Sequence, residues 1–130
     1  MLCLRASRRP LCSAFAVHLD GAFDHAYLFA VARAKLDAGT LPKECAARLA
    51  GCDSLEAFEQ LVTCLPEERS LAAMLDRFCL FLPMVQGDLE ALEEMARRFV
   101  GRQAAQNVLY TEVRYSPHIL TSAATYNPED

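Results

Sequence analysis

Two short β-rich segments lie near opposite ends of this chain, and the residues between them have helical periodicity. The first, Ser13 to Val17, is a run of small and apolar residues that stops at polar residues and Gly21, which is typical of a buried strand followed by a turn. The second, Val108 to Tyr115, is β-rich and precedes Ser116-Pro117. Strand, helices, strand is the opening of an α/β fold, and the crossover is right-handed if the strands are parallel.

The region between the two strands divides into helices at its glycine and proline residues. Asp53 or Ser54, Ser70 and Asp88 are typical N-cap residues for three of these helices. The predicted helices cover 23–37, 42–49, 55–62, 71–82 and a longer stretch from Leu89 past Phe99.

The fourth of these helices has one strongly apolar face. Leu71, Met74, Leu75, Phe78 and Leu82 keep the i, i+3, i+4, i+7 spacing. The spacing predicts an amphipathic helix that ends at the following proline, residue 83, because proline lacks the backbone N–H that continues a helix.

The second strand alternates charged and apolar residues. Glu112 and Arg114 fall on one face with Tyr110, whereas Leu109, Thr111, Val113 and Tyr115 fall on the other. Opposite charges two residues apart on one face can pair. The mouth of a closed parallel barrel tolerates such a pair, and a solvated edge strand explains it equally well.

Composition excludes some classes of function. The net charge of −4 and a pI near 5.3 argue against a surface that tracks nucleic acid phosphates. No apolar run reaches the roughly 18 to 20 residues of a membrane-spanning helix, so we expect a soluble protein and no membrane partner. Six cysteines without any C-x-x-C pair favour free thiols, a reducing compartment and a cytoplasmic location.

The first ten residues carry three arginines and no acid, which is a composition typical of an organellar transit peptide. A solvated start or an altered first exon explains the same residues, and the segment leads directly into the first predicted strand.

A histidine and a carboxylate stand together at the end of that strand. In Val17-His18-Leu19-Asp20-Gly21 the two side chains fall on the same side of the chain, just before a glycine turn. Such a pair can bind a metal or a substrate, and a structural hydrogen-bonded pair is the commoner explanation of the spacing alone.

Two motifs change that interpretation. V-H-L-D-G resembles the first-strand motif of adenosine deaminases, in which His-x-His-x-Asp-Gly follows the opening strand. Residues 111–120, T-E-V-R-Y-S-P-H-I-L, are similar to the E-V-R-Y-S-P-H strand and loop of the same family, and the helix that ends in F-L-P-M resembles its substrate-covering helix. The resemblance spans Val17 to about Leu120.

The resemblance implies the N-terminal part of a (β/α)₈ TIM-type barrel, with 1–15 as a divergent segment and 16–130 as a partial deaminase domain. A complete barrel needs about 200 residues or more, so this chain cannot close one by itself. A partial gene model or a natural truncation is the expected explanation. The resemblance does not indicate an oligomeric state.

The resemblance also assigns site residues. His18 matches a histidine that ligates the catalytic zinc, and Asp20 matches a substrate-contacting carboxylate. Four apolar residues of the fourth helix fall where the family walls its purine pocket, although core packing explains their spacing equally well. These four are Leu71, Met74, Leu75 and Phe78.

One departure from the family pattern concerns the metal. The first histidine of the motif falls on Ala16, which has no lone pair to donate, and the family takes its remaining ligands and its catalytic glutamate from later strands. A catalytic zinc site needs about three protein ligands. We therefore assign no catalytic residue and expect this chain alone to lose zinc and to be inactive.

The implied family reaction is the zinc-dependent hydrolytic deamination of adenosine to inosine and ammonia in purine salvage. The alternative is a catalytically inactive fragment or degenerate relative that acts only as a nucleoside-binding or protein-interaction module.

Overall fold

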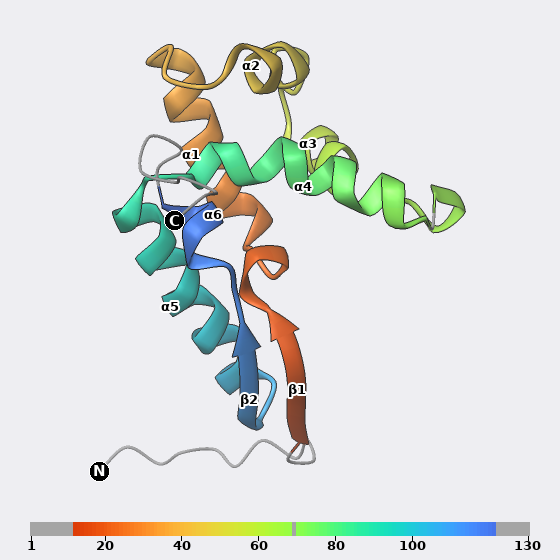
Figure 1. Ribbon diagram of the computed structural model, residues 1–130, viewed down its shortest axis with the longest axis vertical. Coiled ribbons are helices and arrows are strands. Elements are labelled where there is room, and N and C mark those ends of the chain that lie inside the picture. The colour runs from red at the N-terminus through yellow and green to blue at the C-terminus, as the bar shows by residue number, and fades with distance from the viewer. Residues whose placement is uncertain (1–11, 69, 122–130) are drawn as a thin grey trace.

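The computed structural model describes residues 12–68 and 70–121 (Figure 1). Residues 1–11, which hold most of the predicted divergent or targeting segment, and residues 122–130 lie outside the described part. In chain order the elements are β1 (Cys12–His18), the 3-10 helix η1 (Leu19–Gly21), α1 (His25–Asp37), α2 (Lys43–Leu49), α3 (Leu55–Val62), the 3-10 helix η2 (Pro66–Glu68), α4 (Leu71–Val85), α5 (Leu89–Ala105), β2 (Val108–Arg114) and α6 (Pro117–Leu120).

The two predicted strands form a two-stranded parallel sheet. Ala14 lies opposite Thr111 and Val17 lies opposite Val113, so β1 contains one more residue than β2 over this interval. This extra residue makes a β-bulge, and Ala16 within it has a φ of 55°, in the left-handed region that non-glycine residues seldom adopt. Beyond the bulge, His18 lies opposite Arg114 at the C-terminal end of both strands.

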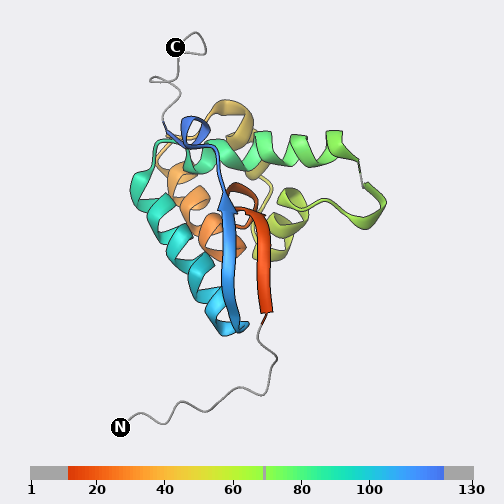
Figure 2. The same ribbon diagram turned by 60° about the horizontal axis from the view of Figure 1, so that its bottom comes forward.

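Helices α1 and α5 lie on one side of this sheet. Figure 2 shows β1 and β2 in front, with α1 and α5 behind them. The Thr111 hydroxyl of β2 lies 3.4 Å from the side-chain oxygen of Gln103 on α5, which fixes this helix against the strand. The architecture is therefore mostly helical with two parallel strands, as predicted.

The hydrophobic core lies mainly among the helices. Phe58 of α3, Leu28 of α1, Leu49 of α2 and Met84 of α4 are at most 1% exposed. β2 contributes little to this core, since Leu109 is 72% exposed and lies on a strand whose side chains are largely open to solvent. None of the helices in the described ranges has the length and apolar character needed to cross a membrane.

Two predicted helix boundaries are wrong. α4 does not end at Pro83 but continues to Val85 with the proline inside it. Met84 and Val85 are fully buried, and we attribute the continuation to this burial, which offsets the lost N–H bond. α1 begins at His25 rather than at Phe23, because the Asp24 carboxylate accepts from the backbone N–H of Tyr27 at 2.9 Å and caps the helix there.

One ion pair joins the end of α1 to the start of α5. The Asp88 carboxylate lies 2.8 Å from the Lys35 ammonium and accepts from the Ala91 N–H at 3.0 Å. The bond from Lys35, together with the helix N–H, holds the pKa of Asp88 below its usual range. Because the folded pKa is lowered, the carboxylate stabilises the fold above its unfolded pKa of about 3.9, and this contribution is lost as the pH falls through the lowered value.

We therefore predict that Asp88→Asn, which keeps a cap acceptor but removes the charge, lowers the free energy of unfolding by up to about 1 kcal/mol at pH 7. The difference from the parent chain should disappear at low pH, where the parent carboxyl is protonated. Urea unfolding at pH 7, 5 and 3 measures both values, and Glu90→Gln in the same helical turn is the control for a general loss of negative charge. An equal difference at all three pH values would contradict the ion-pair explanation.

Candidate functional site

The C-terminal end of β1 holds the predicted histidine and carboxylate together. The 3-10 helix η1 follows β1 directly, and its turn brings the Asp20 carboxylate to 3.4 Å from His18 Nδ1. The His18 side chain is 64% exposed, whereas that of Asp20 is 9% exposed. One carboxylate oxygen of Asp20, Oδ1, is buried and has no hydrogen-bond partner among the described residues.

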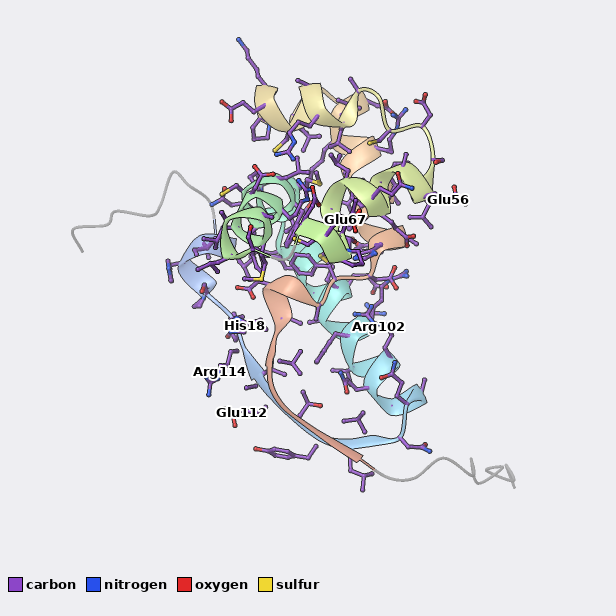
Figure 3. The ribbon with its side chains drawn as sticks, turned by 90° about the vertical axis from the view of Figure 1, so that its right-hand side faces the viewer. His18, Glu56, Glu67, Arg102, Glu112 and Arg114 are labelled. Atoms are coloured by element: carbon purple, nitrogen blue, oxygen red, sulfur yellow. The ribbon has the colours of Figure 1, made fainter. Side chains whose placement is uncertain are left out.

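β2 places a second charged pair beside this one. Arg114 is the register partner of His18, and its guanidinium lies 3.2 Å from the Glu112 carboxylate. The predicted pairing of Glu112 with Arg114 is thus confirmed. Figure 3 shows these two side chains and His18 projecting from the side of the strands away from α5. Parallel strands end at the same edge of a sheet, so the polar groups of both meet here.

An aromatic side chain of α4 lies against the turn. A Cβ atom added at Gly21 would meet the Phe78 ring at 3.2 Å, so the close approach of this ring depends on glycine. The Phe78 and Phe81 rings lie at 44° to each other with their centroids 5.0 Å apart, and Phe81 meets Phe23 edge-on at 5.5 Å. This aromatic row connects α4 to the segment that follows Asp20.

The other three apolar residues predicted for the site are not in the core. Leu71, Met74 and Leu75 are 68%, 44% and 51% exposed, and they lie on the N-terminal half of α4, which projects beyond the other helices (Figure 1). These three residues therefore lie outside the core of the described residues, and their place in a purine pocket stays a prediction. Phe78 differs, because it is half-buried and packs against the core.

Sequence reasoning missed Arg102 on α5. Its guanidinium donates to the backbone carbonyl of Ala22, directly after the turn, and lies 3.4 Å from the Asp24 carboxylate. A charged residue on a helix face gives no sign of such a contact, because the acceptor is a backbone oxygen 80 residues away in the chain.

A small apolar pocket also opens next to the turn. Its volume is about 290 Å³, and the side chains around it include Leu19, Phe23, Leu92, Met95, Tyr115 and Leu120. The signal for this pocket in the sequence was weak, since these residues come from three separate segments of the chain and do not share one periodic pattern.

The described residues do not assemble a metal site. No group of three or more His, Cys, Asp or Glu side chains in residues 12–68 and 70–121 lies close enough together to hold an ion. His18 has one such neighbour, Asp20. Two donors fall short of the three protein ligands of a catalytic zinc site, so zinc does not fit this set of residues.

Comparison with known proteins places the chain in a family. A sequence model described as adenosine deaminase matches residues 10–129. The chain belongs to the adenosine deaminase family. The resemblance predicted from V-H-L-D-G and E-V-R-Y-S-P-H is thereby confirmed.

Similarity to individual members covers part of each relative. Adenosine deaminase of Bos taurus is 32% identical over 107 residues, which are 82% of this chain and 26% of that protein. Adenosine deaminase of Mus musculus is 34% identical over 71 residues, 55% of this chain and 20% of that protein. Adenosine deaminase of Xenopus tropicalis is 42% identical over 57 residues, 44% of this chain and 16% of that protein. The chain thus spans about a quarter or less of these relatives.

The contact of Phe78 with Gly21 gives a test of the site's geometry. We predict that Gly21→Ala lowers the free energy of unfolding by about 1 kcal/mol, because the new methyl group overpacks against the ring. In a Phe78→Leu background the same change should cost at least about 0.5 kcal/mol less, since the residues are in contact. Urea unfolding of the four chains measures this coupling.

Gly51→Ala is the matched control for this cycle, because a Cβ there meets nothing within 4 Å. Its cost should be the same with Phe78 or leucine at the α4 position. Strict additivity of Gly21→Ala and Phe78→Leu would show that α4 does not lie on the turn.

Proposed function

We propose that residues 16–130 form the N-terminal part of an adenosine deaminase (β/α)₈ barrel and supply the first section of its nucleoside site. In the complete protein the reaction is the zinc-dependent hydrolytic deamination of adenosine to inosine and ammonia, in purine salvage. Two features support this proposal. The strands are parallel with helices on one face, and the polar side chains gather at the strands' C-terminal ends, where barrel enzymes hold their substrates.

The buried carboxylate of Asp20 is the observation that carries the proposal, because its Oδ1 atom accepts no hydrogen bond within the described residues and has the His18 Nδ1 atom 3.4 Å away. A buried acceptor that no hydrogen bond satisfies costs about 1 to 3 kcal/mol, so a hydroxyl that donates to the Asp20 carboxylate beside His18 would stabilise the site. The ribose of a nucleoside carries such hydroxyls. His18 lies 3.4 Å away and is open to solvent, so a ligand at Asp20 would also contact its imidazole.

The apolar side chains of α4 complete the proposed binding surface. Phe78 lies against Gly21, directly after Asp20, and offers an aromatic edge for a purine. Met74 and Leu75 lie one turn and Leu71 two turns further along the exposed stripe, where they would extend an apolar wall away from the carboxylate.

Zinc has to obtain most of its ligands from outside the described residues. His18 is the one histidine in our proposed metal set, and Ala16 stands where the family motif has its first histidine. We therefore derive no chemical step from this chain. These observations favour, as a second candidate function, a nucleoside-binding or protein-interaction module without catalysis.

We also propose a reducing compartment such as the cytoplasm. Cys45, Cys52, Cys64 and Cys79 are free thiols, and two of them are buried in the core as small apolar residues.

The role of Asp20 can be tested by ligand binding. We predict that the chain binds adenosine and that Asp20→Ala weakens this binding about tenfold or more, because a hydrogen bond to a charged acceptor contributes about 1.5 to 3 kcal/mol. Adenine, which lacks the ribose hydroxyls, should bind the two chains equally. Titration followed by NMR measures both ligands, with Asp53→Ala, an exposed carboxylate, as the control.

An equal loss of adenine and adenosine affinity in Asp20→Ala would show that this carboxylate does not receive a ribose hydroxyl. Zinc content and ammonia release from adenosine, measured on the same samples, separate the two candidate functions. Release of ammonia by the zinc-loaded chain would exclude the purely binding module, and adenosine binding without release would favour it.

A further inference from the structure

Arg102 contacts the segment that follows the Asp20 turn from the opposite side of the sheet. Figure 3 shows its side chain on the α5 side of the strands, while His18 projects from the other side. Its two terminal nitrogens have separate acceptors: one donates to the Ala22 carbonyl oxygen, and the other lies 3.4 Å from Asp24 Oδ2. Both acceptors lie between β1 and α1.

Ala22 is held through both of its backbone polar groups. Its N–H donates to the Leu19 carbonyl at 3.1 Å, which closes the 3-10 turn, and its carbonyl accepts from Arg102. Asp20 lies inside the turn that these two bonds close. The direction of its carboxylate thus depends on a backbone segment that Arg102 holds in place.

We propose that Arg102 is a positioning residue for nucleoside binding, because it fixes from α5 the turn that aims Asp20 at its ligand. This inference rests on the proposed function. Arginine suits the task because its planar guanidinium reaches a carbonyl and a carboxylate at once, whereas a lysine ammonium is a compact point charge on a flexible stem.

A second arginine on the same helix serves as a control, because it contacts α1 without holding the turn at Asp20. Arg98 lies one turn before Arg102, approaches Asp24 Oδ1 at 3.9 Å and stacks 4.6 Å above the Tyr27 ring. It therefore shares the Asp24 carboxylate with Arg102, whereas the bond to the Ala22 carbonyl comes from Arg102. Asp24 also caps α1 through the Tyr27 N–H, so the start of α1 keeps partners when either arginine is removed.

The experiment compares Arg102→Met, Arg102→Lys and Arg98→Met in the full chain. We expect Arg102→Met to weaken adenosine binding about tenfold, Arg102→Lys to recover part of that loss, and Arg98→Met to keep the parent affinity. The midpoints of thermal unfolding should move by similar small amounts in all three, because both arginines are partly exposed. Hydrogen exchange of the Ala22 amide should accelerate in Arg102→Met alone.

Unchanged adenosine affinity in Arg102→Met, or an equal loss in Arg98→Met, would overturn the positioning role. If the parent chain binds no adenosine, the proposed function fails. The hydrogen-exchange rate of the Ala22 amide then tests separately whether Arg102 holds the turn. Faster exchange in Arg102→Met than in Arg98→Met supports the part of the proposal that concerns the turn, and equal exchange overturns it.

Discussion

The parallel pairing of β1 with β2 is the constraint on which the rest of the structure depends. Two parallel strands cannot be joined by a tight turn, so the chain between them must cross over, and here it does so through α1 to α5. Parallel pairing also brings both C-terminal ends to one edge, which is why His18 meets Arg114 although 95 residues separate them in the chain. With the helices on one face, the polar side chains at this edge are left open on the other.

Local signals in the sequence predicted most of the fold because the forces behind them are local. Ser54, Ser70 and Asp88 each accept from the backbone N–H three residues on, as their residue types predicted. The prediction of the end of α4 failed because the deciding contacts are not local. Pro83 is a local signal to stop, but the burial of Met84 and Val85 depends on residues from other helices, which no window of sequence contains.

The same distinction applies to the candidate site. The contact of His18 with Asp20 spans two residues and follows from a motif, so it was predictable. The hydrogen bond from Arg102 to the Ala22 carbonyl joins residues 80 apart in the chain. Its acceptor is a backbone oxygen, so no residue type in the sequence indicates it. The stripe from Leu71 to Phe78 was predicted as a face, but periodicity cannot tell whether an apolar face is covered, and in this structure its first two turns are exposed.

At the C-terminal ends of β1 and β2, nucleoside binding and metal binding place different demands on the side chains. In the proposed site, the Asp20 carboxylate beside His18 and the aromatic ring against Gly21 would offer a nucleoside a hydrogen-bond acceptor and an apolar contact, because binding needs only complementary groups at one place. A catalytic metal needs three convergent donors, and the described residues bring no such group together at this edge, where His18 has Asp20 beside it. The Glu112 carboxylate at the same edge lies in an ion pair with Arg114. The ends of β1 and β2 therefore fit the proposed role in substrate recognition better than the role of a complete metal site.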